Sequence, residues 1–103
     1  MIKLFLDDTR PAPEDWVRVY TAQQAIDYLK TGEVQQLSLD HDLGPEDIAG
    51  TGYQVLEWIE REVHLHAFKP PTVIKVHSAN PPAAERMRQA IAAIEEYRRN
   101  ACL

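Results

Sequence analysis

The sequence lacks features that are typical of disulfide-rich proteins, of membrane proteins and of proteins with glycine-rich nucleotide-binding loops. Its single cysteine, Cys102, excludes an internal disulfide and a thiolate metal cluster, and we expect no ordered chemistry so near the C-terminus. Only four glycines are present, and the run GTG at residues 50–52 is too short for a Walker or dinucleotide-binding loop. No apolar run approaches the roughly 20 residues of a membrane span, and the opening MIKLFLDD reaches acid too soon for a signal peptide. We therefore expect a cytoplasmic protein without a membrane partner.

Positive charge is also in short supply. Eleven Lys and Arg face sixteen Asp and Glu, which gives a formal net charge of -5. This balance offers no broad basic surface, so sequence-independent binding of nucleic acid is not expected. What the chain does have is 45% hydrophobic and 26% charged residues, the balance of a globular protein with a packed core. Its 103 residues contain no repeat or low-complexity segment, and we predict one domain over residues 1–103.

Strands and helices are predicted to alternate along the chain. Four short apolar runs predict strands at Ile2–Leu6, Val17–Tyr20, Leu37–Leu39 and Thr72–Val76. Apolar residues at helical spacing predict helices that include residues 22–29, 56–63 and 87–94. The order of these elements indicates the doubly wound α/β class, with right-handed crossovers and a parallel sheet covered on both faces.

Local signals mark where these helices begin and end. Thr21 and Thr51 each stand three residues before a glutamine, the pattern of a capping box. Asn80 before two prolines suits an N-cap, and Gly32 suits the left-handed position that closes a helix. The first connection, TRPAPEDW at residues 9–16, carries two prolines, so we expect a loop or a single helical turn there.

Polar residues that could carry chemistry follow the predicted strands. They are Asp7 and Asp8, then Asp40, His41 and Asp42, and finally His77 and Ser78. In parallel α/β sheets, ligands bind outside the carboxyl ends of the strands, so these side chains are predicted to share one site.

The acids of this group predict a divalent-cation site. Carboxylates gathered in a cleft repel one another, and hard oxygen ligands suit Mg²⁺ or Mn²⁺. For a single residue there is a simpler interpretation, in which Asp7 or Asp8 caps a turn and Asp42 belongs to an ordinary loop. Two separate strands ending in LFLDD and LSLDHD favour the metal site for the set.

Histidine, serine and arginine complete the candidate site. His77 and His41 are candidates for proton transfer or metal binding, and His77 is the stronger because it directly follows a strand. No G-x-S-x-G elbow surrounds Ser78, so phosphate binding is its predicted role. Arg10 could bind a phosphate through two hydrogen bonds, although an exposed loop arginine by default only adds charge.

These motifs resemble the receiver domain of response regulators. The resemblance implies that Asp7 and Asp8 bind a divalent cation and that Asp40 occupies the phosphoacceptor position. It further implies that Asp42 lies where the receiver's metal contact is made and that Ser78 holds a phosphoryl oxygen. Receivers have a fifth strand ending in a lysine, for which this sequence shows no candidate, since Lys75 lies inside the fourth predicted strand.

The fuller pattern LFLDDTRP, SLDHDLG, GTGYQVLEWIE and VHSANP resembles the derived group called cyclic-phosphate processing receiver domains. The resemblance implies a truncated, flavodoxin-like receiver with four strands in the order 2-1-3-4. The fourth strand then lies at the sheet edge, where its apolar residues invite covering, and we expect a homodimer through that edge.

The resemblance implies metal-dependent processing of phosphate esters, such as the cyclic phosphate ends of nucleic acids. Asp40 could attack phosphorus directly, or an aspartate could activate water, and His77 or His41 could move the proton. A different class also fits, in which Asp40 accepts a phosphoryl group in signalling. A third interpretation is a degenerate receiver that acts only as an interaction module. The sequence leaves these alternatives open.

Overall fold

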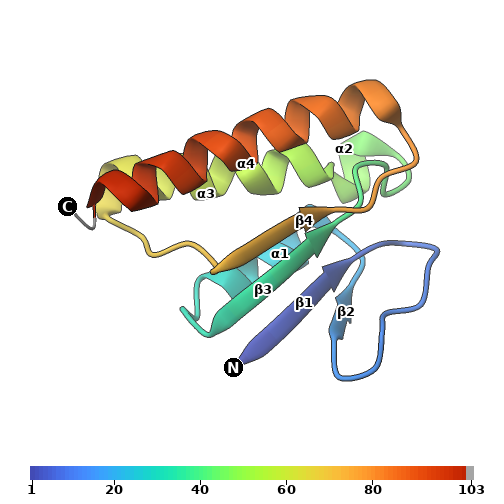
Figure 1. Cartoon of the computed structure of the whole chain (residues 1–103). Coiled ribbons are helices and arrows are strands. Elements are labelled where there is room, and N and C mark those ends of the chain that lie inside the picture. Colours follow the sequence, from blue (N-terminus) through green and yellow to red (C-terminus); the bar gives the residue numbers. More distant parts are fainter. Residues whose placement is uncertain (102–103) are drawn as a thin grey trace.

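Four parallel strands form one sheet in the computed structural model, which describes residues 1–101 (Figure 1). They are β1 (Ile2–Leu6), β2 (Val17–Val19), β3 (Val34–Leu39) and β4 (Val73–Val76), in the order β2-β1-β3-β4. The predicted α/β class, strand direction and strand order are confirmed. Cys102, from which we expected no chemistry, lies outside the described residues.

Strand β3 begins three residues earlier than predicted. Gln35 and Gln36 interrupt the apolar run, but they still extend the ladder, since Gln36 pairs with Lys3 of β1 and Val73 of β4. A polar side chain on one side of a sheet does not weaken backbone pairing. The apolar run therefore predicted only the C-terminal half of this strand.

The helices are α1 (Ala22–Leu29), α2 (Glu46–Ala49), α3 (Gly52–His66) and α4 (Pro81–Ala101). The predicted N-caps are confirmed, but the capping box at Thr21 is not complete, because the Gln24 side chain accepts from the N–H of Tyr20. Thr21 and Thr51 accept hydrogen bonds from the backbone N–H groups three residues on, and Thr51 forms a complete capping box. Asn80 Oδ1 accepts from the N–H of Ala83 at 3.3 Å. Among residues 1–101 no helix is long and apolar enough to cross a membrane.

The three long helices lie on one face of the sheet. Parallel crossovers are right-handed, and the steps from β2 to β3 and from β3 to β4 run the same way, which places α1 and α3 together. Helix α3 packs against both α1 and α4, and Figure 1 shows α3 and α4 above the sheet and α1 behind it. The step from β1 to β2 runs the opposite way through residues 7–16, which include the loop predicted at residues 9–16. Helices therefore cover one face rather than the two that we expected.

The core lies between this helix layer and the sheet. Successive strand residues point to opposite sides, so Leu4 and Leu6 of β1 and Leu37 and Leu39 of β3 all face the helices and are fully buried. Leu56, Ile59 and Met87 from the helices are fully buried as well. The core holds the strands rigidly, and with them the residues at their carboxyl ends.

The other side of the sheet is polar. We call it the open face, formed by Lys3, Phe5, Arg18, Gln36, Ser38, Val73 and Lys75, which neighbour one another across the ladder. Its aromatic residue is sheltered, since the edge of Trp16 from the 7–16 loop packs on the Phe5 ring with centroids 6.4 Å apart. Lys75 is exposed on β4, the edge strand. A homodimer through this edge stays a prediction.

Candidate metal and phosphate site

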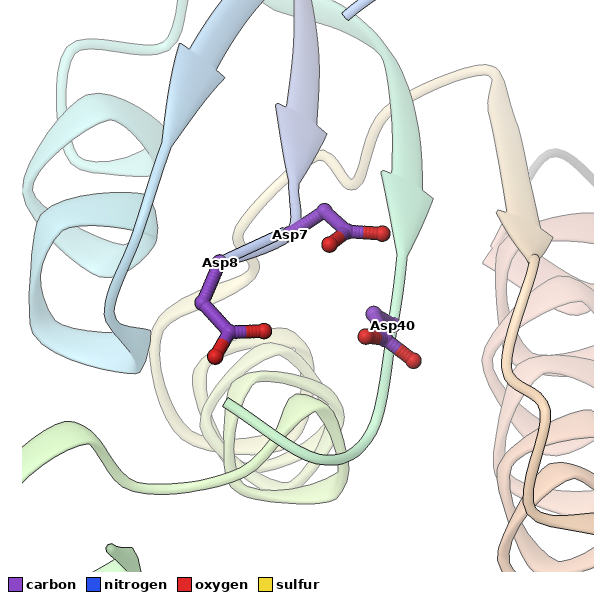
Figure 2. Close-up of side chains that lie close together, drawn as sticks. All are labelled: Asp7, Asp8 and Asp40. Atoms are coloured by element: carbon purple, nitrogen blue, oxygen red, sulfur yellow. The ribbon is translucent and has the colours of Figure 1, made fainter. Parts of the chain in front are cut away.

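Acidic side chains from two adjacent strands meet at the carboxyl edge of the sheet. Asp7 and Asp8 follow β1 and Asp40 follows β3, and the parallel register of these strands pairs Leu6 with Leu39. Figure 2 shows the three side chains around one space, and one oxygen of each lies within 4.8 Å of the others. We call Asp7, Asp8 and Asp40 the carboxylate trio.

Asp7 is fully buried, and four donors hold its carboxylate. Its Oδ1 accepts hydrogen bonds from the backbone N–H groups of Thr9 (2.8 Å) and Arg10 (2.9 Å) and from the Thr9 hydroxyl (3.2 Å). Its Oδ2 accepts from His77 Nε2 at 3.0 Å. Burial alone raises the pKa of Asp7, but these hydrogen bonds, led by the backbone of Arg10 and Thr9, lower it below the usual value. Asp7 thus caps the turn, as in the simpler interpretation, and is also a permanent negative charge of the trio.

The pKa of Asp40 is raised, whereas that of Asp7 is lowered. Burial raises the pKa of Asp40 and the charge of Asp7 raises it further, against the hydrogen bond that the N–H of His41 donates at 2.9 Å. The backbone around it is tightly fixed, because its N–H donates to the carbonyl of Leu6 at 2.9 Å. Helix α3 also begins so close that a Cβ on Gly52 would overlap the Asp40 carbonyl oxygen. Two carboxylates held this close repel each other, which disfavours ionisation of Asp40. A cation bound between them would offset this repulsion.

His77 lies directly beside the trio. Its ring stacks on Phe5 with centroids 4.3 Å apart and planes inclined by 1°. Burial lowers the pKa of His77, although the hydrogen bond to Asp7 and the charge of Asp7 oppose this. The ring is therefore neutral at pH 7, with its proton on Nε2, where the ionised Asp7 can only accept. Nδ1 is then an acceptor.

Ser38 is a site residue that the sequence reasoning missed. Its Oγ lies 2.7 Å from His77 Nδ1 and, given the neutral tautomer, donates to it. Ser38, His77 and Asp7 thus form one chain of hydrogen bonds from the open face to the trio. The available signal was position, because Ser38 precedes Asp40 by two residues and so faces the same side of the sheet.

Of the two predicted phosphate-binding residues, Arg10 contacts this chain and Ser78 follows His77 in the sequence. Arg10 donates a hydrogen bond to the carbonyl oxygen of His77, and its Nε lies 4.0 Å from Asp7 Oδ2. About half of its side chain, 49%, stays exposed. Ser78 accepts a hydrogen bond from the N–H of Asn80 at 3.0 Å, at the start of α4. Each can still donate to a bound anion.

A protein-family model described as cyclic-phosphate processing receiver domain matches residues 2–93. The chain belongs to this family. Neither the curated proteins nor the solved structures include a significant match to it. The matched residues span all four strands, the carboxylate trio and His77, so the resemblance inferred from the motifs is confirmed.

Two further candidate residues of this receiver-like domain point to each other instead of to the trio. Asp42 is 65% exposed, and its carboxylate accepts from His41 Nδ1 at 2.8 Å and from Asn80 Nδ2 at 3.4 Å. The hydrogen bond from His41 is the main reason that the pKa of Asp42 is lowered. The group of acids close enough to share one ion contains Asp7, Asp8 and Asp40 but not Asp42. Metal binding by Asp42 and proton transfer by His41 stay predictions.

Proposed function

We propose that this domain is a metal-dependent phosphoesterase that opens cyclic phosphates at nucleic-acid ends, such as the 2′,3′-cyclic phosphate of RNA. The observation that carries the proposal is the imidazole of His77 hydrogen-bonded to Asp7 of the carboxylate trio, in a chain that belongs to the cyclic-phosphate processing receiver family. A divalent cation bound at the trio would bind and polarise a phosphate, and an imidazole can transfer a proton near neutral pH.

The donor set of the trio fits Mg²⁺ or Mn²⁺. Both prefer carboxylate oxygens, and Mg²⁺ binds at about 2.1 Å, so two ligands on one ion lie roughly 3 to 4 Å apart. One oxygen of each trio residue lies within 4.8 Å of the others, which is close to that spacing. The raised pKa of Asp40 agrees with a place for positive charge. When bound, the cation would polarise the nonbridging phosphate oxygens and offset their developing charge.

The remaining residues would orient the phosphate and handle the proton. Arg10 and Ser78 donate hydrogen bonds to its nonbridging oxygens. Opening the ring forms a P–O bond to the attacking oxygen and breaks the bond to the 2′ or 3′ oxygen, which takes up a proton. His77 carries a proton on Nε2 and accepts at Nδ1, so it can supply one proton and receive another. The attacking oxygen is either a water deprotonated by an aspartate of the trio or a carboxylate oxygen of Asp40. In the second case the covalent aspartyl phosphodiester is hydrolysed in a second step, in which water forms the new bond and Asp40 leaves as a carboxylate.

A second candidate function is a phosphoryl switch. Asp40 stands at the carboxyl end of β3, next to the other two acids, which is the phosphoacceptor position that the receiver resemblance implies. In this function a phosphodonor transfers its phosphoryl group to an Asp40 oxygen and its leaving group departs. No lysine among residues 1–101 lies in the trio's hydrogen-bonded surroundings to neutralise that group, so labelling would be slow.

One experiment separates the two functions. Purified protein with Mn²⁺ or Mg²⁺ is supplied with 2′,3′-cyclic nucleotides and, separately, with acetyl phosphate. As an enzyme it should open the cyclic phosphate, and Asp40→Ala and His77→Ala should each reduce turnover about 100-fold or more. Glu96→Gln removes an exposed acid from α4 and is the matched control that should keep full turnover.

The outcomes of this experiment decide between the functions. Stable labelling of Asp40 by acetyl phosphate, without hydrolysis of any cyclic phosphate, would overturn the enzymatic proposal in favour of the switch. No labelling, no turnover and no metal binding would leave only an interaction module.

A further inference from the structure

We propose that the open face of the sheet binds the single-stranded nucleic acid that leads to the phosphate site. The inference rests on the proposed function, because it concerns what is attached to the reacting phosphate. It extends that function from the terminal group to the preceding nucleotides and would make the domain selective for oligonucleotides over mononucleotides.

The charge of the strands is the first reason. The four strands, IKLFL, VRV, VQQLSL and VIKV, contain three cations and no acid, in a chain of net charge -5. Lys3, Arg18 and Lys75 all belong to the open face, because they pair in register with its other residues. The strands themselves therefore place three cations and no acid on this face, although the connection that crosses it carries Glu14 and Asp15, and phosphates are attracted to cations gathered in this way.

Continuity with the candidate site is the second reason. His77 stacks on Phe5 of the open face and is hydrogen-bonded to Ser38 of the same face. Arg18 donates from Nε to the carbonyl oxygen of Asp7 at 3.2 Å. A strand whose terminal phosphate lies beside the trio and His77 would therefore leave the site directly over these residues.

The spacing of the cations and the nearby aromatic rings suit a nucleic-acid strand. Lys3 and Lys75 are two strands and two residues apart, which corresponds to about 12 Å between their Cα atoms. Their long side chains can follow a flexible backbone over that distance. Trp16 is half-buried beside Phe5, and the exposed Tyr20 ring lies 4.7 Å from the Arg18 guanidinium. Rings and cations along one groove or face are what binds single strands without reading their sequence.

The same features argue against a second copy of the chain as the occupant. A symmetric dimer across the open face would bring Lys3, Arg18 and Lys75 close to their own copies and repel. The face also offers little apolar area, since Phe5 is only 8% exposed. An acidic protein segment would match the charge but would not use the connection to a phosphate site.

The test is fluorescence anisotropy of a labelled single-stranded RNA that ends in a 3′-phosphate, measured in EDTA over a series of salt concentrations. In EDTA binding is observed without metal-dependent turnover. We expect the double variant Lys3→Gln/Lys75→Gln to bind about 10-fold more weakly at low salt. It should also lower the slope of log affinity against log salt by about 1.4, the value for two lost phosphate contacts. The control Lys30→Gln/Lys69→Gln removes two exposed lysines elsewhere and should bind like the parent.

Three outcomes of the binding measurements would overturn the inference. They are unchanged RNA binding by Lys3→Gln/Lys75→Gln, no binding of the RNA by the parent, and equally strong competition by poly-glutamate, which would indicate an acidic protein partner. Turnover of a 2′,3′-cyclic mononucleotide is measured separately and tests the proposed function alone. If the parent turns over the mononucleotide and the oligonucleotide equally well, the open face contributes nothing and the phosphoesterase proposal still stands.

Discussion

Binding of Mg²⁺ should raise the melting temperature, and Asp8→Asn should remove most of that rise. Two carboxylates 4.8 Å apart repel by about 3.5 kcal/mol at an effective dielectric constant near 20, before screening by salt. A cation bound only to the folded state relieves this repulsion. At 100 times its dissociation constant it stabilises by about 2.7 kcal/mol, or roughly 10 to 20 °C for a domain of this size. Asp8 is the most accessible of the three acids and the one whose side chain makes no hydrogen bond within residues 1–101.

The assay is thermal denaturation at constant ionic strength over a Mg²⁺ titration, with binding heats from calorimetry. Asp8→Asn should melt slightly above the parent without metal, because one repulsive charge is gone, and should gain little when metal is added. Glu96→Gln should keep the full metal-dependent rise. An absence of binding heat in the parent would refute the reasoning, and so would an equal metal-dependent rise in Asp8→Asn and Glu96→Gln.

Two other predictions concern stability. Burial lowers the pKa of His77, so the unfolded chain takes up its proton first as pH falls below the ordinary value of 6.5. The free energy of unfolding, from urea titrations in EDTA, should therefore decrease from pH 7.5 to 5.5, and His77→Gln should flatten this decrease. If parent and variant lose stability equally, His77 is not the group responsible. Gly52→Ala should cost about 1 to 3 kcal/mol, because the new Cβ overlaps the Asp40 carbonyl. A Gly52→Ala protein with an unchanged urea midpoint would contradict the close approach of α3.

The sequence was sufficient to predict the location of the site. Parallel strands present their carboxyl ends at one edge, so acids after the first and third strands had to meet whatever the side-chain details. The contact of Ser38 with His77 could not be read in the same way, because it depends on the register between β3 and β4. Which carboxylates share one space also depends on rotamers, and this is why Asp42 pairs with His41 although its sequence position resembles that of the others.

The open face of the sheet is a consequence of the absence of a helix at residues 9–16, which the sequence predicted. Residues 9–16 were expected to form no full helix, and they form none. The right-handed crossover rule makes that same connection the one that must cross the opposite face. Because residues 9–16 form no helix, no helix covers the open face. The strand order and the right-handed crossover rule together would have predicted this.

The hydrogen bonds of His77 also determine when the site can exist during synthesis. Asp7 and His77 are 70 residues apart in sequence, and Arg10 and His77 are 67 apart. The first acids leave the ribosome long before β4 is made, and β4 has to join β3 before the imidazole can reach Asp7. A nascent or truncated chain that ends before residue 77 therefore carries the acids without the imidazole that hydrogen-bonds to Asp7. If the proposed function is correct, such a chain would be inactive until β4 has joined the sheet.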